Sequence, residues 1–191
     1  MPGFLPLKLI QEIRNSDGKH HPTAEWHFVD AGGCSFMLFI FISGGLTLKI
    51  RTAREEDIPA LAYLMEELGY PTSVEEMKLR YDRIASNSNY HTLVAELEGE
   101  VVGMVGLHSD IFYERNEDYA RIVVFVMDSK HRNKGIGKAL NQEAEAWAKE
   151  NGLVAIALNS GNRSERQDAH QFYRRLGYEA TSTGFVKLIE A

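Results

Sequence analysis

The 191-residue chain has few cysteines and no histidine cluster, and both shortages exclude a class of site. Its single cysteine, Cys34, rules out a disulfide within the chain and any cysteine-based metal cluster. Such usage is typical of the reducing cytoplasm, which is the compartment we expect. His20 and His21 are adjacent and the other histidines are scattered, so no metal-ligand spacing stands out and we expect no metal.

The chain also lacks an excess of basic residues and any long apolar run. Its formal net charge is −6, whereas a nucleic-acid-binding domain needs a clustered basic face. The apolar run FMLFIFI at residues 36–42 is far too short to span a bilayer. No basic segment immediately precedes it, as a signal peptide would require. We therefore expect neither a nucleic-acid partner nor a membrane association.

The first 46 residues do not share the regular pattern of the rest of the chain. Their dipeptides Asp17-Gly18, Gly32-Gly33 and Gly44-Gly45 mark turns. The run at residues 36–42 has three interpretations: an added strand or arm, a dimer-contact segment, or sequence upstream of the physiological start. We predict an N-terminal extension over residues 1–46 and one domain over residues 47–191, which is long enough for a sizeable core.

From residue 47 onward, apolar periodicity and turn residues predict a regular series of elements. In chain order they are a strand at 47–52, a helix from Asp57 and Pro59, a helix after the capping box Ser73-x-x-Glu76, a hairpin over 91–108, a polar loop over 109–118, a strand at 122–127, a helix from 136, a strand at 153–158, a helix at 169–176 and two short strands joined at Thr183-Gly184. The order βααβββαβαββ predicts an α/β domain with a mixed sheet, of the α+β kind.

The strongest functional signal lies between residues 119 and 150. The apolar run 122–127 predicts a buried strand, and a polar turn then leads into Lys134-Gly135-Ile136-Gly137 at the start of a helix. A helix start leaves backbone N–H groups without partners and carries a partial positive charge. Glycine lets a phosphate approach the backbone closely. We therefore predict an anion site here, surrounded by cationic side chains: Lys130, Arg132, Lys134 and Lys138.

The hexapeptide from Arg132 to Gly137 reads R-x-x-G-x-G. It lacks the first glycine and the Gly-Lys-Ser/Thr ending of a P-loop, and it lacks the further glycine of a dinucleotide-binding fingerprint. Alone, the hexapeptide is equally compatible with a helix start that is merely rich in small residues.

A second motif lies about thirty residues further along the chain: Ala169-His170-x-Phe172-Tyr173-x-x-Leu176-Gly177-Tyr178. Together with R-x-x-G-x-G and the predicted element order, it resembles the GNAT superfamily of acetyl-CoA-dependent N-acetyltransferases over roughly residues 47–190. The resemblance implies an acyltransferase that uses acetyl-CoA as acyl donor and a primary amine of a small molecule or peptide as acceptor. It is also compatible with a homodimer.

The resemblance implies roles for individual residues. The backbone of Phe125, Val126 and Met127 would pair with the pantetheine arm and polarise the thioester carbonyl. Asn159 would hydrogen-bond the pantetheine, and Tyr173 would lie beside the sulfur as the general acid, because its ordinary pKa near 10 keeps it protonated. Otherwise, Tyr173 is a core aromatic residue, and His170 is expected to be a solvated helix residue. The CoA pyrophosphate would bind the backbone amides of Arg132, Asn133, Lys134, Gly135, Ile136, Gly137 and Lys138.

The general base is the open question in this resemblance. Val123 stands where many relatives carry a glutamate, and Ser129 stands where the family usually has proline. A chain of water molecules could replace the base, and the candidate side chains are His108, Glu114, Glu117 and Asp118. The three acidic residues among them would suit a cationic amine.

Two other functions compete with the enzyme. A non-catalytic acyl-CoA-binding or regulatory module is favoured slightly by Val123, whereas Tyr173 speaks against it. A nucleotide-binding protein is disfavoured because magnesium ligands and Walker features are missing.

Overall fold

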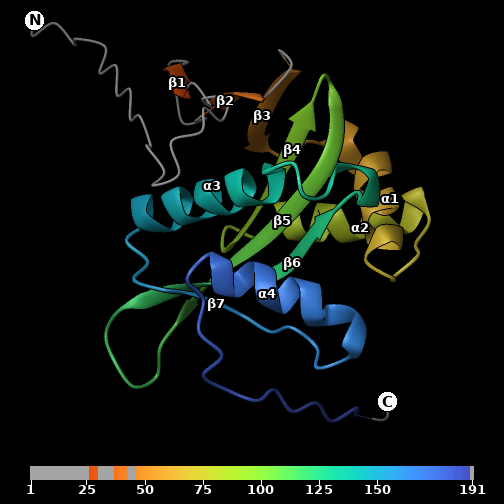
Figure 1. The fold of residues 1–191 in the computed structure, drawn as a ribbon. Coiled ribbons are helices and arrows are strands. Elements are labelled where there is room, and N and C mark those ends of the chain that lie inside the picture. The colour runs from red at the N-terminus through yellow and green to blue at the C-terminus, as the bar shows by residue number, and fades with distance from the viewer. Residues whose placement is uncertain (1–25, 30–36, 43–45, 190–191) are drawn as a thin grey trace, which may run out of the picture.

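The computed structural model describes residues 26–29, 37–42 and 46–189. These residues form a seven-stranded sheet in which the strands lie in chain order, with α3 and α4 in front of the sheet and α1 and α2 behind it (Figure 1). The strands are β1 Trp26–Val29, β2 Met37–Ile42, β3 Leu46–Thr52, β4 Tyr90–Leu97, β5 Glu100–Ile111, β6 Asp118–Met127 and β7 Ile156–Leu158. The helices are α1 Ile58–Glu67, α2 Val74–Ala85, α3 Ile136–Glu150 and α4 Gln167–Arg175, and three 3₁₀ turns are η1 Glu55–Asp57, η2 Ser129–His131 and η3 Ser164–Arg166.

All neighbouring strands from β1 to β6 pair antiparallel, whereas β6 and β7 pair parallel. This mixed sheet with helices on both faces confirms the predicted fold class. From β3 to α4 the element order is the one that the sequence predicts.

The helix starts follow local sequence signals. In α2 the Ser73 hydroxyl accepts a hydrogen bond from the Glu76 amide at 3.2 Å, as the capping box predicts. The Glu76 carboxylate accepts from the Thr72 hydroxyl at 2.8 Å. Pro59 lies in the first turn of α1, where its missing N–H costs nothing.

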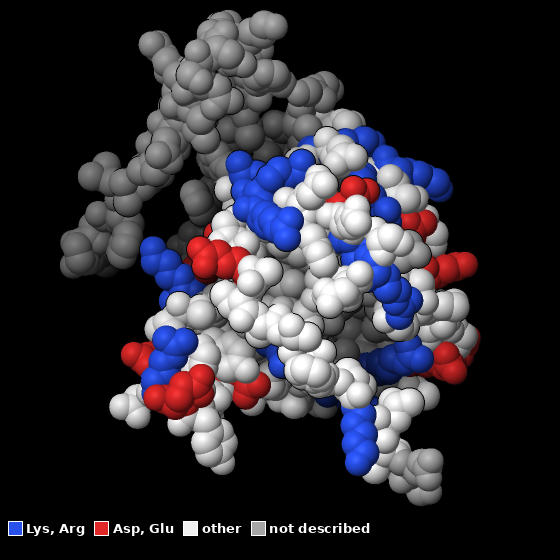
Figure 2. Space-filling model, turned by 60° about the horizontal axis from the view of Figure 1, so that its bottom comes forward, with Lys and Arg blue, Asp and Glu red and all other residues white. Residues whose placement is uncertain are grey.

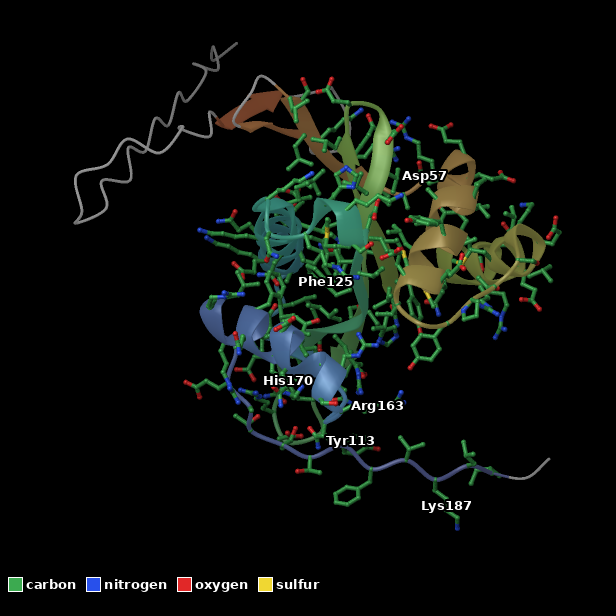
Figure 3. All side chains as sticks on the ribbon, turned by 45° about the vertical axis from the view of Figure 1, so that its right-hand side comes forward. Asp57, Tyr113, Phe125, Arg163, His170 and Lys187 are labelled. Carbon is green, nitrogen blue, oxygen red and sulfur yellow. The ribbon has the colours of Figure 1, made fainter. Side chains whose placement is uncertain are left out.

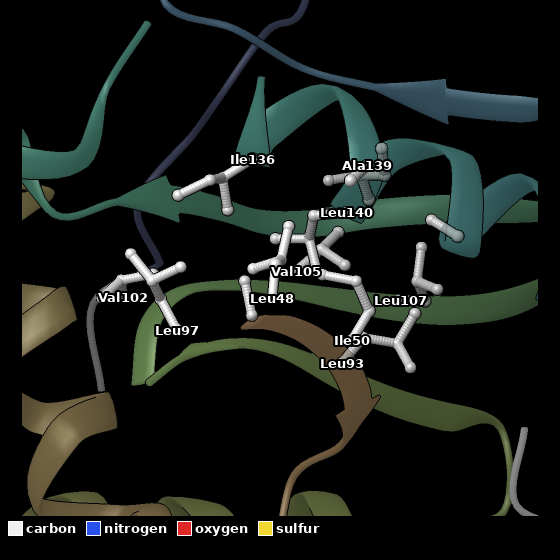
Figure 4. Packing of buried hydrophobic residues seen from close by; sticks show 13 residues of the cluster. Leu48, Ile50, Leu93, Leu97, Val102, Val105, Leu107, Ile136, Ala139 and Leu140 are labelled. Atoms are coloured by element: carbon white, nitrogen blue, oxygen red, sulfur yellow. The ribbon is translucent and has the colours of Figure 1, made fainter. Parts of the chain in front are cut away.

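The sheet carries one hydrophobic core on each face. Helix α3 places Ile136, Leu140 and Ala144 against β3, β4, β5 and β6 (Figure 4). On the opposite face, α1 and α2 pack Leu61, Leu64 and other apolar side chains on β4, β5 and β6. Helices therefore pack against both faces of strands β5 and β6.

A buried ion pair joins β3 to the start of α1. Arg51 and Asp57 are 7% and 5% exposed, and their two hydrogen bonds measure 2.7 and 2.8 Å. Arg51 also donates to Glu96 on β4 at 2.6 Å. Because both charges are withdrawn from water, removing one partner would leave a buried charge poorly compensated, which is destabilising.

The C-terminal part of the structure differs from the prediction. Residues 177–189 contain no strand, and Phe185, Val186, Leu188 and Ile189 are 82–93% exposed. The apolar pattern there is typical of a strand, but a strand also needs a partner edge along its length. Strand β7 offers only three residues, compared with the predicted strand over 153–158.

Two other expectations are revised by the structure. The predicted loop over residues 109–118 is shorter, because β5 extends to Ile111 and pairs with the start of β6 at Asp118. Residues 37–42 form β2, which pairs with β3 and fits the first of the three interpretations, an added strand. The expectations for His20, His21 and Cys34 concern residues outside those that the structure describes.

Candidate active site

Strands β6 and β7 diverge and open a cleft between them. Their parallel pairing ends at Ile122 and Leu158, whereas β6 continues to Met127. One edge of this continuation pairs with β5, so the backbone groups on the other edge face the cleft. The cleft has a volume of about 230 Å³ and is lined by Leu68, Tyr70, Ile122, Val123, Val124, Phe125, Leu158, Asn159, Ser160, Gly161, Arg163, Arg166, Ala169 and Tyr173.

A β-bulge lies in the wall of this cleft. Val124 pairs with Gly106 and Ile122 with Leu107, which leaves Val123 without an opposite residue on β5. Val123 is 50% exposed. Bulges are common beside active sites because they redirect a side chain. Val123 thus lines the cleft with an apolar side chain that cannot accept a proton.

The glycine turn lies at the end of β6. Asn133 and Gly135 have φ angles of +61° and +81°, and Gly135 is the N-cap of α3. The Ala139 amide donates to the Gly135 carbonyl at 3.1 Å, so the amides of Ile136, Gly137 and Lys138 precede this first helical hydrogen bond. A Cβ built on Gly135 meets nothing within 4 Å. The turn thus offers unpaired donors and open space, which fits a diphosphate.

Gly137 has a different role in the same turn. A Cβ at this position would lie 3.3 Å from the Phe172 ring and 3.8 Å from Met127. Glycine here lets the start of α3 approach α4 and β6 closely. The second glycine of R-x-x-G-x-G therefore contacts Phe172 of the second motif, which lies about thirty residues further along the chain.

Two carboxylates that sequence reasoning missed hold the turn in place. Asp128 accepts hydrogen bonds from the Lys130 amide and from His131 Nδ1, both at 3.0 Å. Burial alone raises the pKa of Asp128, but these hydrogen bonds outweigh it and the pKa lies below its usual value. Glu67, the last residue of α1, accepts from the Ser129 amide at 3.0 Å. This backbone hydrogen bond lowers the pKa of Glu67.

The Arg132 side chain forms hydrogen bonds with other residues of the chain. Its Nε and Nη2 donate to the Met127 carbonyl at 3.3 Å, and Nη2 lies 3.5 Å from Glu67 Oε2. The carbonyl of Met127 therefore has a partner already, whereas the cleft is lined by Val123, Val124 and Phe125. The part of β6 that borders the cleft begins earlier than the predicted range of Phe125 to Met127.

Tyr173 lies in the cleft within an aromatic cluster. Its ring centroid is 6.3 Å from that of Phe125, 5.5 Å from that of Phe172 and 5.7 Å from that of Tyr178. Burial raises the pKa of the Tyr173 hydroxyl, and the positive charge of Arg166 partly opposes this shift. Tyr173 thus stays protonated at neutral pH and borders the open edge of β6.

The segment after β7 contributes the opposite wall. Asn159 lines the cleft, and its amide is oriented to accept from Arg121 Nη2 at 2.8 Å and to donate to the Leu158 carbonyl at 3.2 Å. His170 lies on α4, and its Nε2 donates to the Gly161 carbonyl at 3.0 Å. His170 thereby fixes the segment that leads to α4 (Figure 3).

None of the four candidate bases lines the cleft. His108 lies on β5, where its ring centroid is 4.5 Å from that of Tyr90. Glu114 and Glu117 lie in the β5–β6 loop, and Asp118 begins β6 at the far end from the glycine turn. The structure therefore does not bring these carboxylates or His108 to the reacting end of the cleft.

The charged lining residues of the cleft are Arg163 and Arg166, which sequence reasoning missed. Arg166 Nη2 donates to the Leu68 carbonyl at 3.2 Å and so connects the start of α4 to the end of α1. The only sequence signal was the polar run at residues 159–168, which reads as an ordinary connection without its partners in space.

The glycine turn at the start of α3, the second motif on α4 and the order of the elements are the features by which the chain resembles the GNAT acetyltransferases. Residues 58–178 match the family described as the acetyltransferase (GNAT) family, and the chain belongs to this family. A GNAT family acetyltransferase of Staphylococcus aureus has a crystal structure similar to this one, with a TM-score of 0.65 and 33% identity. That similarity covers 74% of this chain and 98% of the other.

Curated relatives point to the same family. The chain is 31% identical over 144 residues to an aminoalkylphosphonate N-acetyltransferase of Salmonella typhimurium, which covers 74% of this chain and 91% of the relative. It is 27% identical over 141 residues to an N-acetyltransferase of Bacillus subtilis, at 73% and 96% coverage. Among the residues that the structure describes, no helix has the length and apolarity needed to cross a membrane.

Proposed function

We propose that the protein transfers the acetyl group of acetyl-CoA directly to a primary amine of a small molecule or peptide. One observation carries this proposal: the free edge of β6 leads along the cleft to the glycine turn at the start of α3. A strand edge with unpaired backbone groups suits the amides of pantetheine, and the turn suits a diphosphate.

The chain's own groups fit acetyl-CoA along this path. The amides of Ile136, Gly137 and Lys138 would hold the diphosphate, with the side chains of Lys134 and Lys138 exposed beside them. The backbone of β6 between Val123 and Val126 would hold the pantetheine arm, and Asn159 would face it from the other wall.

When bound, acetyl-CoA supplies a thioester whose carbonyl carbon accepts a nucleophile. A backbone N–H on the free edge of β6 stabilises the negative charge that develops on the carbonyl oxygen. The amine nitrogen forms the new C–N bond as the C–S bond breaks, and the amine loses one proton. Tyr173 donates a proton to the departing sulfur, because burial keeps its hydroxyl protonated.

Water is the proton acceptor that this cleft favours. Among the residues that the structure describes, the cleft lining includes no Asp, Glu or His. Glu67 holds the glycine turn, but its hydrogen bond from Ser129 lowers its pKa and makes it a poor base. The amine therefore enters in its neutral form or loses its proton through water in the cleft.

The same lack of a base supports one alternative, a non-catalytic acyl-CoA-binding module. A two-stage measurement separates the two functions. Acetyl-CoA is first titrated into the protein by calorimetry, and thiol release is then followed with a panel of primary amines. An enzyme binds acetyl-CoA and releases CoA only when an amine is present. Binding without amine-dependent release on any amine would establish the module instead.

A further inference from the structure

The charge inside the cleft is opposite to that of the whole protein. The chain carries a net charge of −6, yet the charged lining residues are two arginines, and no carboxylate that the structure describes lines the cleft. On the face shown in Figure 2, Lys and Arg side chains border a largely uncharged central area, and most Asp and Glu side chains lie toward its margins. Such a local reversal of charge indicates a preference for an anionic group.

Arg166 is held so that part of its guanidinium group remains available. Its backbone amide donates to the Arg163 carbonyl at 2.9 Å, and Nη2 donates to the Leu68 carbonyl at 3.2 Å. Of the carboxylates whose side chains the structure describes, none forms an ion pair with Arg163 or Arg166. A guanidinium group has five N–H donors, so most of those on Arg166 are left for a ligand.

Arg166 lies at the start of α4, whereas the glycine turn packs against a later residue of the same helix. That later residue is Phe172, which lies against the position of Gly137. The Arg166 charge also acts on the Tyr173 hydroxyl. An anion bound to Arg166 would thus lie close to Tyr173, at the reacting end of the cleft.

We propose that Arg163 and Arg166 bind an anionic group of the acceptor, so that the preferred substrate is a small primary amine that also carries a phosphoryl or carboxylate group. This inference rests on the proposed acetyltransferase function. The planar fork of arginine suits both anions, which share two oxygens at matching spacing. The pantetheine arm would share this cleft of about 230 Å³, so little space is left for the acceptor, which favours a short one.

The inference reverses the expectation that acidic loop residues select a cationic amine. Glu114, Glu117 and Asp118 do not line the cleft. A polyamine would place further positive charge beside two arginines, which is unfavourable in a partly buried site. Selection by charge therefore acts through the start of α4 and not through the β5–β6 loop.

The test compares four acceptors at a fixed, saturating acetyl-CoA concentration, with thiol release as the readout. They are 2-aminoethyl phosphate, β-alanine, propylamine and spermidine, so that a phosphoryl anion, a carboxylate, no second charge and extra positive charge are each represented. We expect kcat/KM to be highest for one of the two anionic amines, and the first two acceptors show which anion is preferred.

The variants Arg166→Gln and Arg163→Gln then test the residues. We expect each to lower kcat/KM for the preferred anionic amine by roughly 10- to 100-fold, mainly through KM, because a charge-assisted hydrogen bond is lost. The KM for acetyl-CoA should change by less than about twofold, and kcat/KM for propylamine should fall by less than kcat/KM for the preferred anionic amine. Arg166→Lys should restore part of the loss. Arg175→Gln, on the exposed C-terminal end of α4, is the matched control.

Each contrary result has a distinct meaning. Turnover of no amine would remove the acetyltransferase function itself. Turnover that is fastest with spermidine or propylamine would overturn this inference and leave that function intact. A rise in the KM for acetyl-CoA in the arginine variants, with acceptor preference unchanged, would assign the arginines to the cofactor and also overturn the inference.

Discussion

Replacing Gly135 by valine tests whether the glycine turn binds the diphosphate. Gly135 has a φ of +81°, and the space where a side chain would project is open. A β-branched residue in this left-handed conformation costs about 2–3 kcal/mol. For a chain of this length the melting temperature should fall by roughly 4–12 °C, and the protein should remain folded.

The effect on CoA binding should be larger than the strain alone explains. The valine side chain would occupy the space in which the diphosphate is expected and would move it away from the amides of Ile136 and Gly137. A hydrogen bond to a charged group contributes about 1.5–3 kcal/mol. Losing two of them raises the dissociation constant for CoA by at least about 100-fold.

The chain provides a matched control at the other end of α3. Gly152 has a φ of +72° and also meets nothing within 4 Å of an added Cβ. Gly152→Val should therefore lower the melting temperature by a similar amount while CoA affinity stays within about twofold of the unchanged protein. Thermal melts by circular dichroism and CoA titrations by calorimetry measure both quantities. An equal loss of CoA affinity in the two variants would refute the assignment of the turn.

Three further substitutions have expected outcomes. Asp57→Asn removes one of the two carboxylates that pair with the buried Arg51, while Glu96 remains, so we expect a loss of about 1.5–3 kcal/mol in the free energy of unfolding. Burial raises the pKa of Asp57, but pairing with Arg51 outweighs burial and the folded pKa lies below the usual value. The stability that Asp57 contributes is therefore present above the unfolded pKa near 4 and is lost as pH falls through the folded pKa. In denaturant melts, the free energies of unfolding of the variant and the unchanged protein should differ less at pH 3 than at pH 7. Tyr173→Phe should lower kcat by about 100-fold. Because burial raises the pKa of Tyr173, the unchanged enzyme should keep its rate up to at least about pH 10. An unaltered kcat in the Tyr173→Phe variant would exclude the acid role. Glu67→Ala releases the Ser129 amide and should raise the KM for acetyl-CoA roughly two- to tenfold, with partial rescue in Glu67→Gln, whereas an unchanged KM would show that the turn holds its shape without Glu67.

Local sequence signals predicted those parts of the fold that depend on near neighbours. Apolar periodicity predicted a helix from residue 136, and Ser73 predicted the start of α2. In both cases a helix needs only residues three or four positions apart to be recognisable. The C-terminal segment shows the limit, because the apolar pattern at residues 185–189 could not reveal whether a partner strand is present.

Two short motifs were enough to assign the family from the residues alone, because glycines at a helix start and an aromatic pair near a helix end are local requirements. Which residues share the cleft became known from the three-dimensional arrangement. The Phe172 ring near Gly137, the contact of Arg166 with Leu68 and the exclusion of Glu114 all depend on where β6 and β7 separate. That separation is a property of strand pairing between distant segments, and neither strand's residues encode it alone.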